Sequence, residues 1–237
     1  MLEDLLPRGR WRPEVHSALL DILRGPPGVM CLDWDETCAS GDIGEALLDY
    51  LDPSGQEMAA YQSTLATGEV LKAYVESIYV LAGMRPEEAL ETCSKAVEWA
   101  LKAGRVAVRP EMRALMEAGR ASGWQVWVVT ASVTPLVQAF AGLYGLPSDR
   151  VLGMNLLLEG GVYQRGLHGP ATYRKGKVEA IRAVVGEMPT LAAGDTLTDL
   201  EMLLSSKYGL VIGPRHPELQ RHADQQGWLC QPIFEST

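Results

Sequence analysis

The chain has 237 residues, of which 21 are Lys or Arg and 30 are Asp or Glu, so its formal net charge is -9. This length allows one or two domains, and a hydrophobic content of 47% with 22% charged residues is typical of a chain that buries a core. The acidic balance argues against binding to nucleic acid or to an anionic membrane, since no basic surplus can neutralise many phosphate groups. A phosphorylated ligand would need one local site or a metal ion.

The start of the sequence and its cysteines predict a cytoplasmic protein. Residues 1–7 are acidic and lack the basic start and apolar run of a signal peptide. The four cysteines are scattered, with neither the spacing of a zinc site nor that of a disulfide framework. No apolar stretch approaches the roughly 18 residues that a membrane-spanning helix requires, so we expect no membrane partner.

The first half of the chain predicts a helix, a buried strand and then a purely helical segment. The helix is expected over residues 11–24, before the turn residues 25–28. Residues 29–32 form a short apolar run, typical of a strand covered on both faces, and acidic residues follow at once. Residues 42–106 have apolar side chains at helical spacing and no convincing strand, so they predict an all-helical insert.

After the insert, strands and helices alternate. Strands are expected at residues 124–130, 190–193, 209–212 and 228–232, and a hairpin at 151–158 and 162–167. Helices are expected from 110 to either 119 or 123, and at 132–146, 177–185, 197–204 and 217–226. The alternation predicts an α/β fold, a three-layer Rossmann-like parallel sheet, with a core of residues 1–41 and 107–237 and a helical cap of residues 42–106. Ligands of such sheets bind beyond the carboxyl ends of the strands.

Polar residues follow two of the predicted strands at that edge. Asp33 and Asp35 come directly after the first strand. Two carboxylates so close repel each other unless a cation such as Mg²⁺ neutralises them, and one could then act as a nucleophile and the other as an acid/base. Thr130 and Ser132 come before a predicted helix, whose free N–H groups could bind an anion, although capping of that helix is the ordinary explanation.

The later part of the chain adds a lysine and two more acids. Lys177 stands at the start of a predicted helix, with Lys175 two residues before it. We favour Lys177 as the group that offsets phosphoryl charge, because apolar helical spacing begins directly after it. Asp195 follows Gly194 at a strand end, where it could bind a metal, and Asp199 could orient a water or hold the lysine. A solvated turn, a surface lysine or a helix cap would explain each signal alone, but their order along one sheet favours a single site.

The chain resembles the haloacid dehalogenase-like (HAD) superfamily in four motifs: Asp33-Trp-Asp-Glu-Thr37, Trp127-Val-Val-Thr130, Lys177 and Gly194-Asp-Thr-Leu-Thr-Asp199. The helical insert resembles the cap of the branch that includes phosphoserine and phosphocholine phosphatases. The resemblance implies a Mg²⁺-dependent phosphatase that hydrolyses a small phosphorylated metabolite through an aspartyl-phosphate. A phosphotransferase or mutase of the same superfamily, and a non-catalytic protein that binds a phosphate ligand, are the alternatives.

The resemblance also implies a role for each motif residue. Four residues would be catalytic: Asp33 as nucleophile, Asp35 as acid/base, and Thr130 and Lys177 as ligands of the phosphoryl oxygens. Four would hold Mg²⁺: Asp33, Asp35 through its backbone carbonyl, Asp195, and Asp199 in support through water or Lys177. Besides Thr130 and Lys177, substrate contacts would come from Asp42 and from the backbone N–H groups of Trp34 and Ala131.

The sequence departs from phosphoserine phosphatases near the expected substrate. Asp42, close to Glu45, stands where those enzymes have a glutamate that contacts the substrate amine, and Ala131-Ser132 replace two glycines. Both differences argue against phosphoserine as the substrate.

Three aromatic residues of the insert allow two interpretations. Tyr61, Tyr74 and Trp99 could enclose a quaternary amine by cation–π contact. Aromatic residues at helical spacing are more often part of a core, and that is the interpretation we favour.

Overall fold

The computed structural model describes residues 1–214 and 216–234. A six-stranded sheet in the order β10-β9-β8-β1-β4-β5 lies at its centre, and every neighbouring pair in it is parallel. Its strands are β1 (Val29–Leu32), β4 (Gln125–Val133), β5 (Val151–Met154), β8 (Leu191–Gly194), β9 (Tyr208–Ile212) and β10 (Leu229–Gln231). The predicted parallel α/β sheet is therefore confirmed.

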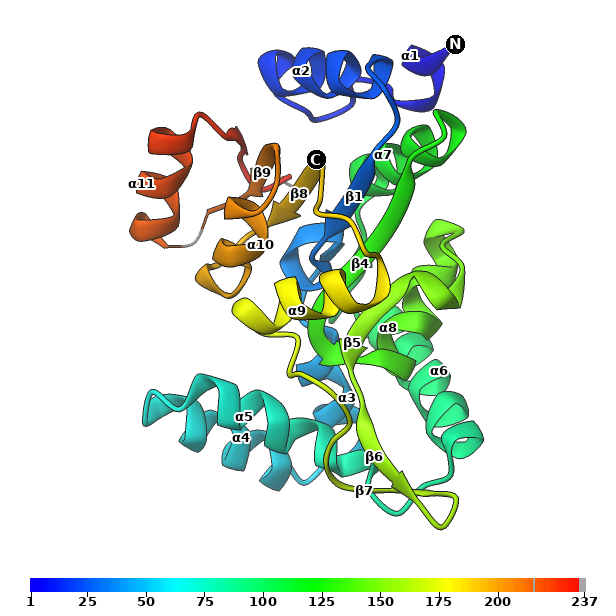
Figure 1. Ribbon diagram of the computed structural model, residues 1–237. Helices are drawn as coiled ribbons and strands as arrows, with labels where there is room; N and C mark the ends of the chain where they lie inside the picture. Colours follow the sequence, from blue (N-terminus) through cyan, green and yellow to red (C-terminus); the bar gives the residue numbers. More distant parts are fainter. Residues whose placement is uncertain (215, 235–237) are drawn as a thin grey trace.

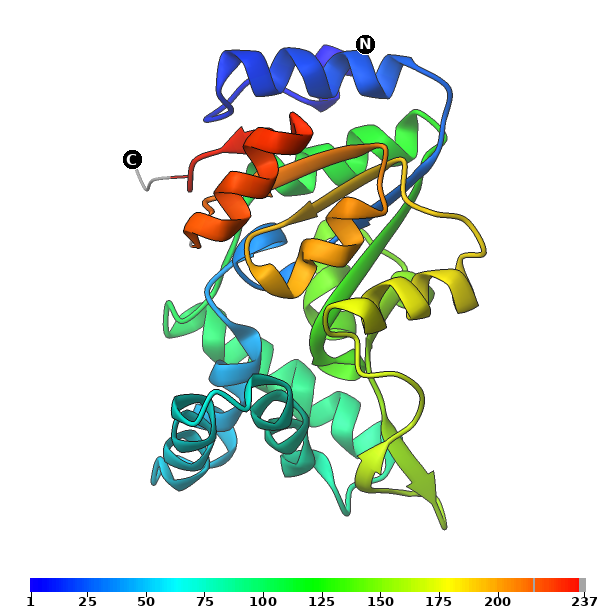
Figure 2. The same cartoon turned by 60° about the vertical axis from the view of Figure 1, so that its left-hand side comes forward.

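Helices cover both faces of the sheet, which gives the predicted three layers (Figures 1 and 2). Because successive side chains of a strand point to opposite faces, Met30 and Leu32 of β1 join one apolar cluster and Val29 and Cys31 join the other. The first cluster includes residues of α2 (Pro13–Arg24), α7 (Pro110–Ala121) and α8 (Thr134–Ala141). The second includes residues of α9 (Lys175–Val184), α10 (Leu200–Leu204) and α11 (Pro217–Gln226). A short helix, α1 (Leu2–Leu5), precedes them.

The helical insert leaves and re-enters the sheet domain through two short paired strands. β2 (Ala39–Ser40) and β3 (Ala107–Val108) are antiparallel neighbours. Gly41 allows this approach, because its φ is +83° and an added Cβ would lie 2.2 Å from the carbonyl oxygen of Arg105. Between the two strands the structure has α3 (Ile43–Leu51), α4 (Gln56–Ala66), α5 (Val70–Ser77), a 3₁₀ turn (Ile78–Leu81) and α6 (Pro86–Lys102).

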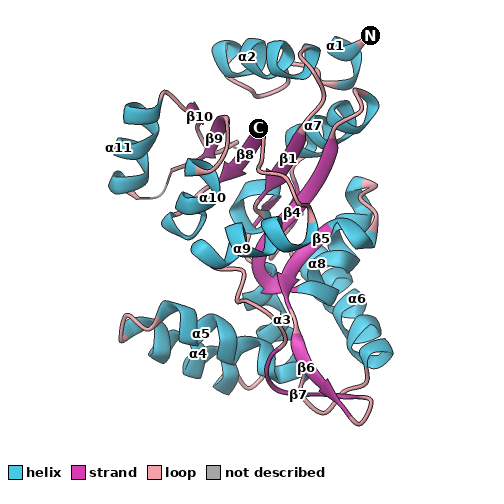
Figure 3. Ribbon diagram, in the orientation of Figure 1, coloured by secondary structure: helices cyan, strands magenta, loops and turns pink. Residues whose placement is uncertain are grey.

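This segment contains only helices, as expected, and Figures 1 and 3 show it beyond one end of the sheet. The division of the chain into a core and a cap at residues 42 and 106 stays a prediction. Among the described residues, no helix combines the length and the apolar character needed to cross a membrane.

The structure corrects the bounds of several expected elements. The single strand expected at residues 151–158 is interrupted at Asn155: β5 joins the main sheet, whereas β6 (Leu156–Glu159) pairs only with β7 (Val162–Leu167). This hairpin lies against the helical insert, because the backbone of Tyr163 exchanges hydrogen bonds with Gly83 and Met84 at 2.7 and 2.8 Å. A local apolar pattern does not distinguish one long strand from two strands that pair with different partners.

The second correction concerns the strand that carries Thr130. β4 continues through Val133 instead of ending at residue 130, and α8 begins at Thr134 rather than at 132. Pro135 in the first turn of α8 accounts for the later start, since proline favours that position. α9 also begins two residues earlier than expected, at Lys175.

Candidate active site

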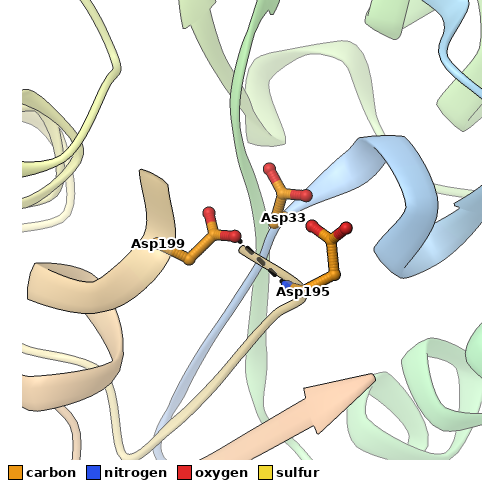
Figure 4. A group of neighbouring side chains, drawn as sticks. All are labelled: Asp33, Asp195 and Asp199. Carbon is orange, nitrogen blue, oxygen red and sulfur yellow. Dashed lines mark hydrogen bonds between the residues drawn. The ribbon is translucent and has the colours of Figure 1, made fainter. Parts of the chain in front are cut away.

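Three of the predicted acidic residues meet at the carboxyl ends of adjacent strands. Asp33 directly follows β1 and Asp195 directly follows β8, and these strands are neighbours in the sheet. Asp199 ends a 3₁₀ turn (Leu197–Asp199) that brings its side chain back toward Asp33 (Figure 4). One carboxylate oxygen from each residue lies within 4.8 Å of the others, and all three residues are buried.

Lys177 is the lysine that the fold brings into this site. Its ammonium donates hydrogen bonds to Asp33 Oδ1 at 2.6 Å, to Asp199 Oδ1 at 2.6 Å and to the carbonyl oxygen of Val129 at 2.8 Å. Its side chain is completely buried, whereas Lys175 is exposed. Burial alone would lower the pKa of Lys177, but the charges of Asp199 and Asp33 outweigh it and raise the pKa, so the side chain stays charged.

The charge balance of the site favours a bound cation. Burial and the neighbouring charge of Asp199 raise the pKa of Asp33 to about 6, although the attraction of Lys177 opposes both effects. When ionised, the carboxylates of Asp33, Asp195 and Asp199 outnumber the single ammonium of Lys177. A hard divalent cation suits such oxygen donors, so these three residues fit Mg²⁺.

The carboxylate of Asp35 lies apart from this acidic group. Its Oδ1 accepts a hydrogen bond from the backbone N–H of Ile43 at 2.8 Å, and its Oδ2 accepts one from Ser132 Oγ at 2.6 Å. Burial and the charge of Asp42 raise its pKa well above the ordinary value. A contribution of Asp35 to metal binding through its carbonyl remains a prediction.

The expected anion site at Thr130 has a different local structure. α8 begins four residues after Thr130, and its N-cap is Val133, without a side-chain cap. Neither the predicted helix start beside Thr130 nor capping by Thr130 or Ser132 is therefore correct. The Thr130 hydroxyl instead accepts the N–H of Ser132 at 3.0 Å, and Thr130 and Ala131 line a pocket together with Asp33.

This pocket lies between the strand ends and the helical insert. Residues of the sheet domain form one side of its described lining: Asp33, Asp35, Thr130, Ala131, Ser132 and Asp195. Residues of the insert form the other side: Asp42, Glu45, Tyr61 and Tyr74. The insert thus covers three of the predicted catalytic residues, Asp33, Asp35 and Thr130. The fourth, Lys177, is buried and does not line the pocket. Asp42 also caps α3, because its Oδ1 accepts the N–H of Glu45 at 2.9 Å.

The aromatic residues divide between pocket and core. Tyr61 and Tyr74 stack at 6.3 Å between ring centroids and line the pocket, whereas Trp99 packs near Tyr50 at 5.9 Å and does not line it. The three residues do not form one cage. The Trp34 side chain is fully buried and lies apart from the pocket lining, so only its backbone remains available for the predicted substrate contact.

The sequence analysis missed an ion pair between buried Arg109 and partly buried Glu36, which supports the loop that carries Asp35. Arg109 donates to the carbonyl oxygen of Glu36 at 2.6 Å and to its carboxylate at 2.8 Å. Glu36 has a φ of 56°, a left-handed conformation that non-glycine residues rarely adopt, so it requires such support. Arg109 precedes Pro110 and indicates only a helix start in the sequence, because its partner lies 73 positions away.

Comparison with known proteins shows the family of this chain. The family model for haloacid dehalogenase-like hydrolases matches residues 31–204, more than half of the chain, and the chain belongs to this family. It is therefore identified as a hydrolase of the superfamily whose motifs it carries. A search of curated proteins yields no match.

Solved structures share the fold at low sequence identity. A protein of unknown function from Anaerococcus prevotii DSM 20548 is 17% identical, with a TM-score of 0.78 over 95% of this chain and 93% of its own. One from Bordetella pertussis Tohama I is 18% identical, with a TM-score of 0.76 over 87% and 98% of the two chains. A substrate-bound phosphoserine phosphatase is 16% identical, with a TM-score of 0.62 over 89% and 94%.

Proposed function

We propose that this hydrolase is a Mg²⁺-dependent phosphatase that acts on a small phosphomonoester through an aspartyl-phosphate at Asp33. One observation carries the proposal: the Asp33 carboxylate lines a pocket, is bonded to the buried ammonium of Lys177 and is grouped with Asp195 and Asp199. This arrangement supplies a fixed nucleophile, and a cation bound by the three carboxylates would supply the positive charge that a phosphoryl group requires.

The roles of the residues follow from their contacts. Asp33 Oδ1 is bonded to Lys177, so Oδ2 is the oxygen that attacks phosphorus, and the bond from phosphorus to the leaving oxygen breaks. Asp35 gives its proton to that oxygen. It then takes a proton from the water that attacks phosphorus, which releases phosphate and restores Asp33. Mg²⁺, held by Asp33, Asp195 and Asp199, would supply positive charge beside the phosphoryl oxygens.

The pocket favours an alcohol portion without a second negative charge. None of its described lining residues is Lys, Arg or His, while Asp42 and Glu45 add acidic groups on the side of the insert. A substrate carboxylate there would face negative charge without a cationic partner. We therefore expect phosphocholine or phosphoethanolamine to be a better substrate than phosphoserine, with Tyr61 and Tyr74 beside the amine.

A nucleophile variant tests the proposal. Asp33→Asn is expected to abolish Mg²⁺-dependent hydrolysis of p-nitrophenyl phosphate while its circular dichroism spectrum stays that of the wild type. Asp149→Asn, which changes a carboxylate in a 3₁₀ turn outside the pocket, serves as the control. Undiminished turnover by Asp33→Asn would contradict the assignment.

A panel of phosphorylated metabolites, including phosphoserine, phosphocholine and sugar phosphates, identifies the substrate. Release of inorganic phosphate from a single substrate distinguishes hydrolysis from transfer to another alcohol. Tight binding of vanadate without hydrolysis of any phosphoester would instead favour a non-catalytic phosphate-binding protein.

A further inference from the structure

Ser132 contacts the acid/base Asp35 directly, although it belongs to none of the four motifs. Its hydroxyl donates a hydrogen bond to Asp35 Oδ2 at 2.6 Å, and both residues line the pocket. The other carboxylate oxygen, Oδ1, accepts the N–H of Ile43 at 2.8 Å. Both oxygens of Asp35 thus have a protein partner, one from strand β4 and one from Ile43, the first residue of helix α3.

The two partners differ in what they can do. A backbone N–H only donates, so Oδ1 stays an acceptor as long as the bond to Ile43 lasts. A serine hydroxyl both donates and accepts. Oδ2 is therefore the oxygen that can carry the proton for the leaving group, while Ser132 donates its own hydrogen to a lone pair of that oxygen and leaves the Asp35 proton directed at the substrate.

The local backbone directs Ser132 to this position. The pairing of β4 with β5 is interrupted between Val129 and Val133, and such irregularities commonly redirect a side chain. Within this interval the N–H of Ser132 bonds to Thr130 Oγ1 at 3.0 Å. Ser132 is also not the cap of α8, whose N-cap is Val133, so helix capping does not account for the serine.

We propose that Ser132 is a positioning residue that orients Oδ2 of Asp35 toward the leaving oxygen of the substrate. The inference rests on the proposed phosphatase function. Removing the hydroxyl leaves Asp35 present but held only through Oδ1. Proton transfer to the leaving group then becomes less efficient, whereas attack by Asp33 is preserved.

Two substrates with different leaving groups test this role. An alkyl phosphate such as phosphoethanolamine needs a proton on its departing oxygen, whereas p-nitrophenolate departs readily without one. The parameter to compare is kcat/KM, because it reports the steps up to formation of the aspartyl-phosphate and excludes the later attack by water. The variants are Ser132→Ala, Ser132→Thr, which keeps a hydroxyl, and the control Ser94→Ala, whose exposed hydroxyl bonds within helix α6.

For Ser132→Ala we expect kcat/KM for the alkyl phosphate to fall about 10- to 100-fold, since a general acid contributes on the order of 10²–10⁴-fold. For p-nitrophenyl phosphate we expect a decrease of less than about threefold, because that leaving group needs little acid catalysis. Ser132→Thr should restore most of the alkyl phosphate activity, and Ser94→Ala should match the wild type.

The experiment distinguishes a failure of this inference from a failure of the proposed function. An equal loss with both substrates, or no loss with the alkyl phosphate, shows that Ser132 does not position Asp35. Thermal unfolding of each variant separates a folding defect from a catalytic one, and the ratio between the two substrates is unaffected by a loss of folded protein. Absence of phosphatase activity in the wild type contradicts the proposed function itself.

Discussion

Replacing Lys177 by methionine provides the strongest test of how the acidic site is held together. Lys177 is completely buried, and its ammonium makes hydrogen bonds to two carboxylates and one carbonyl oxygen. Methionine keeps the length of the side chain but removes the charge. It leaves Asp33 and Asp199 buried without their cation, and loss of one partner of a buried ion pair costs about 3–5 kcal/mol of unfolding free energy.

The assay is thermal and urea unfolding in EDTA, so that no metal compensates for the lost charge. For a protein of this size, about 3–5 kcal/mol corresponds to a decrease of roughly 6–20 °C in Tm. Lys175→Met is the matched control, because Lys175 is exposed in the same helix, and its effect should stay within about 0.5 kcal/mol.

The penalty should also increase with pH. The folded-state pKa of Asp33 is already raised to about 6, and removal of the ammonium that opposes this shift raises it further. Above pH 6, folded Lys177→Met therefore holds a proton on Asp33 that the unfolded chain releases, and stability decreases with pH wherever the folded state binds more protons. The difference from wild type should be larger at pH 8 than at pH 6. A variant as stable as wild type at pH 8 would refute this account of the site.

Three further variants test other parts of the structure. Gly194→Ala places a Cβ 2.4 Å from the Cβ of Asp199, so Asp199 must move. The Mg²⁺ concentration for half-maximal activity should then rise about 10-fold or more in a metal titration. An unchanged titration would show that Asp199 does not contribute to metal binding. Trp34→Ala removes a fully buried ring and should cost about 3–5 kcal/mol in urea unfolding, so a loss below about 1 kcal/mol would contradict its core role. Arg109→Met removes the donor of two hydrogen bonds, to the backbone and to the carboxylate of Glu36, and should cost about 1–3 kcal/mol with reduced kcat. Full activity would show that the loop keeps its shape without Arg109.

The fold class could be predicted from the sequence because the patterns that indicate strands and helices are local. Apolar runs such as residues 29–32 and 209–212 are short enough to be recognised as strands, and each is bounded by turn residues or acids. The position of Asp33 and Asp195 at strand ends followed from the same patterns, since parallel strands place their carboxyl ends at one edge. Element boundaries were less certain, as the early end assigned to β4 and the undivided strand at residues 151–158 show.

The sequence alone determined the class of protein. It did so through the order of its features along the chain: an apolar strand, paired acids, a hydroxyl, a lysine and a last acidic pair. Only the tertiary structure decided which side chains share the site. Lys177 meets Asp33 across 144 positions of the chain, and Ser132 meets Asp35 across 97. The physical reason is that periodicity records which face of an element is buried, whereas a hydrogen bond between distant residues depends on how the elements pack.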